Sequence, residues 1–254
     1  MDSTRFFDVV FFDLGSTLIY FDAAWPEVFA TQHRELAHDL IAKGYDLDVD
    51  SFTAGFAARL NAYYQERETE FLEQTIEYIL RRMLGELGYP DAPSAHLRPA
   101  LDRMYAVSQA HWQLEADAHP TLHTLRDAGY RLGLISNAND ADDVEMLIDM
   151  HGLRPFFEII LVSAAVVYRK PHPEIFRMAL KPFGVPAQRA VMVGDTLGAD
   201  ILGARNSGLS SIWITRHADA PGNRDHLDTI RPDAVVDTLA EIPDLLANWQ
   251  DREA

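Results

Sequence analysis

Short, uninterrupted runs of apolar residues recur along the chain, and each run ends in small or polar residues. Continuous rather than alternating apolarity is typical of strands that are buried on both faces. The runs therefore predict the strands of a parallel sheet. They are Val9–Phe12, Arg131–Ile135, Ile159–Val162, Ala190–Val193, Ser211–Ile214 and Ala234–Val236.

Segments with helical periodicity separate these runs from residue 116 onward. His119–Ala128 ends before a glycine, Pro173–Lys181 follows the third run, and Asp200–Asn206 follows the fourth. Strands and helices in alternation predict an α/β fold with a doubly wound parallel sheet. The tail, Asp244–Ala254, is expected to form the end of an amphipathic helix.

Residues 21–115 have a different pattern, with helical periodicity and no convincing buried strand. Glycines that follow the apolar stripes mark helix ends in this segment. Three helices are expected, over residues 25–43, over residues 71–87, and from residue 95 through at least residue 105. We therefore expect an α/β core of residues 1–20 and 116–254, interrupted by an inserted helical domain of residues 21–115.

Composition and charge narrow the class of protein. Of the 254 residues, 48% are hydrophobic and 24% are charged, which is typical of a globular protein rather than a disordered chain. The net charge of −17 argues against nucleic acid and anionic membranes as partners, so an anionic substrate needs a local positive site. No cysteine is present, which excludes disulfides and thiol catalysis. The first apolar run is too short to span a bilayer and no export signal is visible, so a cytoplasmic location is expected.

Residues whose side chains can bind a ligand or take part in catalysis follow the predicted strands. Ligands of doubly wound sheets bind beyond the carboxyl ends of the strands, so these residues are expected to meet at one edge. Asp13-Leu14-Gly15-Ser16 follows the first run, Ser136-Asn137-Ala138-Asn139 the second, and Gly194-Asp195-Thr196-Leu197-Gly198-Ala199-Asp200 the fourth, while Arg169-Lys170-Pro171 lies downstream of the third.

These residue types fit phosphoryl chemistry. Asp13 and Asp195, with Asp200 as an optional third, supply the hard oxygen ligands that Mg²⁺ takes in small numbers beside water and phosphate. A carboxylate can also act as a nucleophile and form an acyl phosphate. Ser136 can donate its hydroxyl to a phosphoryl oxygen, and Lys170 supplies fixed positive charge for the same group.

The motifs resemble those of the haloacid dehalogenase-like (HAD) hydrolase superfamily, in the family's order. They are FFDLGSTL with Asp13, GLISNA with Ser136, RKPHPEIF with Lys170, and VMVGDTLGAD with Asp195 and Asp200. The helical insert is similar to the α-helical cap of the haloacid dehalogenase and phosphoglycolate phosphatase branch. The resemblance implies a Rossmann-like core with an inserted cap, and a Mg²⁺-dependent phosphatase that acts on a small phosphorylated metabolite.

The resemblance also implies roles for individual residues. Asp13 would be the nucleophile and would carry the phosphoryl group as phospho-Asp13. The metal ligands would be Asp13, the backbone carbonyl of Gly15, and Asp195, with Asp200 acting through water or orienting Lys170. The phosphoryl group would be held by Ser136, the backbone of Asn137, and Lys170.

Gly15 departs from the family pattern. Family phosphatases usually carry a second aspartate at this position, where it protonates the leaving alcohol and then activates the hydrolytic water. Glycine keeps the backbone carbonyl but has no acid, and general acid–base catalysis typically contributes about 10²–10⁴-fold. Substrates with good leaving groups are expected to suffer less. A substitute acid from the cap or a metal-bound water are the alternatives.

Two other functions stay open. The first is a low-activity member that binds a phosphorylated ligand or a protein partner, which the glycine at position 15 motivates. The second is a haloacid dehalogenase, which needs no metal, although retention of both Asp195 and Asp200 favours metal and phosphate. The acid-rich segment Asp140–Asp143 is interpreted as a helix N-terminus that complements the helix dipole.

Overall fold

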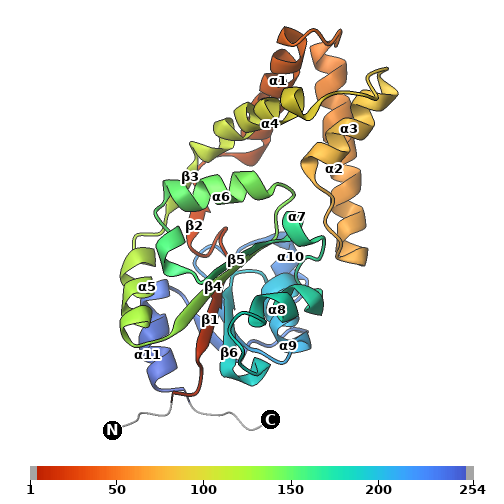
Figure 1. The fold of residues 1–254 in the computed structure, drawn as a ribbon. Helices are drawn as coiled ribbons and strands as arrows, with labels where there is room; N and C mark the ends of the chain where they lie inside the picture. The colour runs from red at the N-terminus through yellow and green to blue at the C-terminus, as the bar shows by residue number, and fades with distance from the viewer. Residues whose placement is uncertain (1–4, 250–254) are drawn as a thin grey trace.

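The core of the protein is a parallel β-sheet with helices on both faces (Figure 1). The computed structural model describes residues 5–249, and within this range the sheet has six strands in the order β5-β4-β1-β6-β7-β8. All the predicted apolar runs are confirmed as its strands. They are β1 (Val9–Phe12), β4 (Arg131–Ser136), β5 (Ile159–Val162), β6 (Ala190–Gly194), β7 (Ser210–Ile214) and β8 (Ala234–Val236).

Alternate residues of β1, β4, β5 and β6 contribute to two separate apolar cores. Val10 and Phe12 pack with α5 (Ala118–Asp127), α6 (Ala141–Met150) and α11 (Ile242–Ala247), whereas Val9 and Phe11 pack with α8 (Pro173–Leu180) and α9 (Leu202–Asn206). This arrangement confirms the doubly wound, Rossmann-like fold. The shorter elements are η1 (Arg154–Phe156), α7 (Ser163–Val166), η2 (Ala187–Arg189), the π-turn η3 (Leu197–Ile201), α10 (Pro221–Arg224) and η4 (Leu239–Glu241). Residues 250–254 of the predicted tail lie outside the described range.

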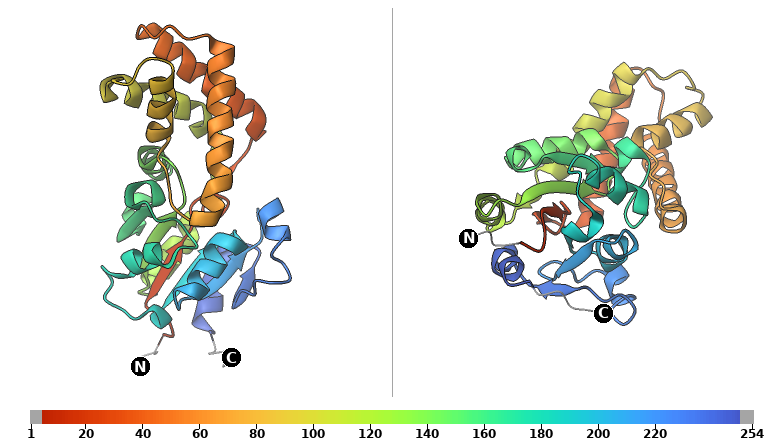
Figure 2. Two further views of the ribbon diagram at one scale, coloured as in Figure 1. Left: turned by 90° about the vertical axis from the view of Figure 1, so that its right-hand side faces the viewer. Right: turned by 60° about the horizontal axis from the view of Figure 1, so that its bottom comes forward.

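A group of helices stands beyond the carboxyl edge of the sheet (Figures 1 and 2). We call residues 25–109 the helical insert, which contains α1 (Trp25–Ala42), α2 (Val49–Glu70), α3 (Ile76–Glu86) and α4 (Ser94–Gln109). The insert has its own apolar core, in which Leu36, Phe56, Leu80 and Leu101 are fully buried. The predictions of α1 and α4 are confirmed, and α2 was not predicted.

The prediction of one helix over residues 71–87 is wrong at its N-terminal end, because α3 begins at Ile76. Residues 71–75, which we call the return segment, run back from the insert to the core. There the Glu73 N–H donates to the Val167 carbonyl (2.6 Å), and the Arg169 N–H donates to the Phe71 carbonyl (3.1 Å). These backbone hydrogen bonds to the core replace the helical bonds that the local pattern favoured.

The chain enters and leaves the insert through a short antiparallel pair, β2 (Ile19–Phe21) and β3 (Trp112–Leu114). The sequence showed no convincing buried strand over residues 21–115, and β3 is only half-buried. Two strands of three residues each are too short to give an alternating pattern, and they pair over a long sequence separation. Within residues 5–249, no helix is both long enough and apolar enough to cross a membrane.

Candidate active site

Asp13 and Lys170 form the centre of the site. The Asp13 N–H donates to the Val193 carbonyl (2.9 Å), which fixes the aspartate at the carboxyl end of β1. The Lys170 ammonium donates to Asp13 Oδ1 (2.6 Å) and to the Ile135 carbonyl (2.7 Å). It also forms an ion pair with Asp200 Oδ1 (2.7 Å). The lysine therefore joins the end of β4 to carboxylates from two other elements.

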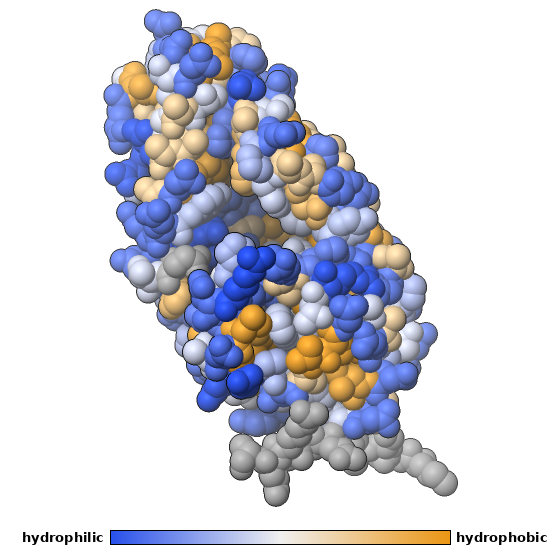
Figure 3. Space-filling model, turned by 180° about the vertical axis from the view of Figure 1, so that it is seen from behind, coloured by the Kyte–Doolittle hydropathy of each residue, from blue (hydrophilic) through white to orange (hydrophobic). Residues whose placement is uncertain are grey.

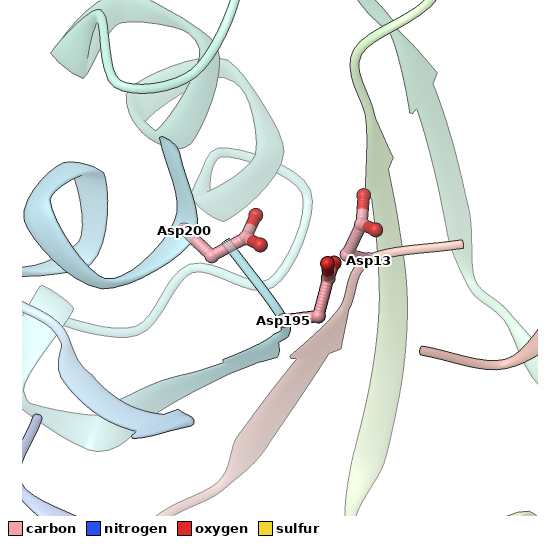
Figure 4. A group of neighbouring side chains, drawn as sticks. All are labelled: Asp13, Asp195 and Asp200. Atoms are coloured by element: carbon pink, nitrogen blue, oxygen red, sulfur yellow. The ribbon is translucent and has the colours of Figure 1, made fainter. Parts of the chain in front are cut away.

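The three predicted acids lie together (Figure 4). Asp13 and Asp195 follow the neighbouring strands β1 and β6, and Asp200 points toward them from the π-turn η3. One carboxylate oxygen from each acid lies within 4.8 Å of the others. A Cβ on Gly194 would come within 2.3 Å of Asp200 Cγ, so glycine at this position permits the close approach of the carboxylate.

Burial and mutual repulsion shape the protonation of these groups. Burial raises the pKa of Asp13 to about 6, against the opposing effect of the Lys170 ammonium. Burial, then the nearby Asp13 and Asp200 carboxylates, raise the pKa of Asp195 well above its ordinary value. Burial by itself would lower the pKa of Lys170, but the Asp13 and Asp200 carboxylates outweigh it and raise the pKa.

The donor set suits a divalent cation. Three buried carboxylates face one ammonium group, so their full ionisation leaves an excess of two negative charges that a divalent cation would offset. Mg²⁺ is bound in proteins through one or two carboxylates together with waters and phosphate oxygens. Asp13 and Asp195 could ligate such an ion directly. Both oxygens of Asp200 have contacts, one with Lys170 and one with the Thr196 N–H (3.0 Å), which makes it foremost an orienting group for the lysine.

Ser136 is the last residue of β4 and Asn137 follows it, and both line the same cavity as Asp13. The Asn137 side chain has a contact that sequence reasoning missed. Its Nδ2 donates to the Lys170 carbonyl (2.8 Å), and its Oδ1 accepts from the Lys170 N–H (2.8 Å). These paired hydrogen bonds hold the lysine segment beside the loop that carries Ser136.

A cavity of about 680 Å³ lies where the helical insert faces the sheet. Seen from behind, the surface is recessed between the upper and lower parts of the molecule (Figure 3). Insert residues Arg67 and Phe71 line the cavity together with core residues. The structure brings all the predicted site residues to this cavity, namely Asp13, Gly15, Ser136, Asn137, Lys170, Asp195 and Asp200.

Other residues at the site carried no recognisable sequence signal. Asn223, from α10, donates to the Asp195 carbonyl (2.8 Å) and accepts from the Leu197 N–H (2.7 Å), which fixes the acid-bearing loop. Trp112 covers Gly15, since a Cβ at position 15 would lie 3.3 Å from Trp112 Cη2. Asp143 also lines the cavity, although its sequence context indicated only a helix N-terminus.

Comparisons with known proteins agree with this fold and site. A family model described as haloacid dehalogenase-like hydrolase matches residues 7–208. A glyceraldehyde 3-phosphate phosphatase from Pyrococcus abyssi is 30% identical over 216 residues, covering 81% of this chain and 80% of the relative. A phosphoserine phosphatase from Thermus thermophilus is 32% identical over 166 residues, covering 65% of this chain and 63% of the relative. A solved structure of a 2-haloacid dehalogenase from Pseudomonas syringae pv. Tomato DC3000 is 27% identical with a TM-score of 0.67, covering 96% of this chain and all of that one (100%).

The fold and the comparisons together define the class of protein. The family match spans most of the chain, and the similar proteins include phosphatases of this family. The chain therefore belongs to the haloacid dehalogenase-like hydrolase family. It is a hydrolase whose motif residues line one cavity at the carboxyl edge of the sheet.

Proposed function

We propose that this protein is a Mg²⁺-dependent phosphatase of a small phosphorylated metabolite and that it acts through a phospho-Asp13 intermediate. The observation that carries the proposal is the buried contact of Lys170 with both Asp13 and Asp200, beside Asp195, at the cavity. A paired carboxylate and ammonium next to two further acids match the needs of phosphoryl transfer. The phosphatase relatives support the same reaction class.

Each residue then has a defined task. Asp13 attacks phosphorus in line with the leaving oxygen, while the Ser136 hydroxyl, the Asn137 backbone and the Lys170 ammonium hold the phosphoryl oxygens. The proposed metal ligands are Asp13, the Gly15 carbonyl and Asp195, while Asp200 orients Lys170. A bound Mg²⁺ would offset the charge that spreads over the phosphoryl group.

We further propose that residues 21–115 act as a cap on a core of residues 1–20 and 116–254. The cavity supports this division because its lining comes from both parts of the chain. The return segment gives the insert a third attachment to the core besides β2 and β3. A metabolite bound at Asp13 would therefore be enclosed by side chains of the insert, such as Arg67. The cap would then determine which substrate the enzyme accepts.

The test is hydrolysis of p-nitrophenyl phosphate, whose leaving group needs no proton, with Mg²⁺ and with chelator. The parent should require the metal, and Asp13→Asn should lose about 10³-fold or more in kcat/KM because the nucleophile is gone. Asp22→Asn is the matched control, since Asp22 is exposed and pairs with His111 away from the cavity. An Asp13→Asn variant that is as fast as the parent would refute the assignment.

A dehalogenase is the second candidate, because the solved dehalogenase resembles the whole chain. In that reaction Asp13 would attack carbon, and no metal would be needed. Chloride release from a 2-chloro acid in the presence of chelator would favour it. A binding protein without turnover would instead be stabilised by phosphate while remaining inactive towards every phosphate ester.

A further inference from the structure

The position two residues after the nucleophile, which usually supplies a proton in this family, has no side chain here and leaves little room for one. Gly15 offers only its backbone, and a Cβ at position 15 would lie 3.3 Å from the ring of Trp112, which is a tight contact. An alkoxide is a poor leaving group unless it is protonated as it departs. The proton would then come from a metal-bound water or from another group that lines the cavity.

Among the described residues that line the cavity, two side chains that could donate this proton lie outside the cluster of Asp13, Asp195 and Asp200. They are Asp143 and His226. The ring of His226 lies against Gly198, 3.4 Å from its Cβ position, and so borders the turn that carries Asp200. Asp143 lies on the first turn of α6, which follows the Ser136–Asn137 loop. Its Oδ1 accepts a hydrogen bond from Gln109 Nε2 of α4 (2.8 Å).

The direction of phosphoryl transfer favours Asp143 over His226 as the proton donor. The leaving group departs on the side of phosphorus opposite the attacking Asp13 oxygen. Asp13 lies at the edge of the sheet, and the helical insert lies beyond that edge (Figure 1), so the leaving oxygen faces the insert. Asp143 is hydrogen-bonded to an insert helix, which places its carboxyl group on the leaving-group side. His226 lies on the side of the metal ligands.

We propose that Asp143 is the general acid and base of this hydrolase, in the role that Gly15 leaves empty; this inference rests on the proposed phosphatase function. In the first step Asp13 Oδ bonds to phosphorus, the bond to the leaving oxygen breaks with its electron pair, and the Asp143 proton moves to that oxygen. In the second step the Asp143 carboxylate takes a proton from water as the water oxygen bonds to phosphorus and the bond to Asp13 breaks. Phosphate leaves, and Asp143 is protonated again.

The surroundings of Asp143 suit both steps. Burial raises its pKa to about 7, the Gln109 hydrogen bond opposes this, the Asp140 carboxylate adds to it, and the Arg98 charge lowers it. The Tyr105 hydroxyl also faces this group, and burial raises the pKa of Tyr105 well above its ordinary value, which keeps the hydroxyl neutral. Both protonation states of Asp143 are therefore populated near neutral pH, as alternate acid and base catalysis requires.

The backbone of Asp143 is held in place by neighbouring side chains. The Asp140 side chain accepts from the Asp143 N–H (3.0 Å) and pairs with Arg98 of α4 (2.8 Å). Asp142, on the same turn, is exposed and lies 3.3 Å from Arg98. The two neighbouring aspartates thus provide a test residue in the cavity and a matched control outside it.

The experiment is a leaving-group series measured on the parent, Asp143→Asn and Asp142→Asn. The substrates are 2,4-dinitrophenyl, p-nitrophenyl and phenyl phosphate and an alkyl phosphate. Asp143→Asn should lower kcat/KM for phenyl and alkyl phosphate by about 10²–10⁴-fold and leave that of 2,4-dinitrophenyl phosphate nearly unchanged. With 2,4-dinitrophenyl phosphate, the kcat of Asp143→Asn should still fall after a burst of 2,4-dinitrophenolate, because the second step has lost its base. Asp142→Asn should follow the parent throughout.

A purely structural role would give a different result. Equal losses of kcat/KM across the series, or no loss at all, would overturn the proposal. Gln109→Leu provides an independent test that keeps the carboxyl group, since loss of its hydrogen bond should raise the pKa of Asp143 and move the pH profile of the parent upward. An unmoved profile would count against Asp143. Failure of the phosphatase proposal itself is distinct, because the parent would then hydrolyse none of these esters, or Asp13→Asn would hydrolyse them all as fast as the parent.

Discussion

Gly15→Asp probes whether Trp112 occupies the place of the absent side chain. Gly15 is not among the glycines with positive φ, so its backbone accepts an L-residue without strain. The obstacle is the indole ring, since the new Cβ would lie 3.3 Å from Cη2 and 3.7 Å from Cζ3 of Trp112. The ring is itself fixed by edge contacts with Phe21 and Trp25, whose centroids lie 5.2 Å and 5.6 Å away.

These contacts set the expected change in the free energy of unfolding. Loss of glycine flexibility in the unfolded chain stabilises the protein by about 0.4–1 kcal/mol. Insertion of atoms into a packed space costs about 1–3 kcal/mol. Gly15→Asp should therefore destabilise the protein by about 0–2.6 kcal/mol. Trp112→Phe shortens the ring, so the double variant should be more stable than the sum of the two single changes by about 1 kcal/mol.

The assay is urea unfolding of the parent, both single variants and the double variant, with the coupling free energy taken from the cycle. Midpoints are compared at constant slope, so that a change in stability is not confused with a change in the exposed surface. Additive effects of the two substitutions would refute the claim that Trp112 fills the space at position 15. A Gly15→Asp variant more stable than the parent would do the same.

Further predictions concern the charged groups. Asp143→Asn should stabilise the protein more at pH 8 than at pH 5 in thermal unfolding. Because the pKa of Asp143 is raised from 3.8 to about 7, the parent loses stability as the pH rises from about 4 to about 7, and each pKa unit is worth about 1.4 kcal/mol. An equal gain at both pH values would contradict this. Glu73→Ala should lower the free energy of unfolding by about 3–5 kcal/mol, because it deprives Ser163 (2.5 Å) and Arg169 (3.7 Å) of a buried carboxylate. Glu73→Gln should lower the free energy of unfolding clearly less. Equal losses in the two variants would show that the charge of Glu73, rather than its hydrogen bonds, fixes the return segment. Mg²⁺ at about 100 times its Kd should stabilise the parent by about 2.7 kcal/mol and Asp195→Asn markedly less, as calorimetry would show; the same gain in both proteins would remove Asp195 from the ligand set.

The strands and the motif residues were predictable because their signals are local. Continuous apolar runs mark strands buried on both faces, and parallel strands place the residues after them at one edge, so Asp13, Ser136 and Asp195 meet there. The α2 helix also has a local signal, since Phe52, Phe56 and Leu60 recur at helical spacing and are buried.

The rest depends on contacts between distant segments. The return segment fits a helical pattern, yet its backbone bonds to Val167 and Arg169 of the core. The Asn137 side chain binds the backbone of Lys170, a partner that no local pattern specifies. Asp143 was interpreted as a charge for the helix dipole, and only the packing of α4 against α6 shows that it is half-buried at the cavity.

Trapping of the covalent intermediate tests the central claim most directly. The protein would be mixed with p-nitrophenyl phosphate and Mg²⁺, quenched during turnover, and treated with borohydride, which reduces an aspartyl phosphate to homoserine. Peptide mass spectrometry should find homoserine at position 13 only when substrate and metal were both present. Turnover without modification at Asp13, or with modification at another carboxylate, would contradict the account.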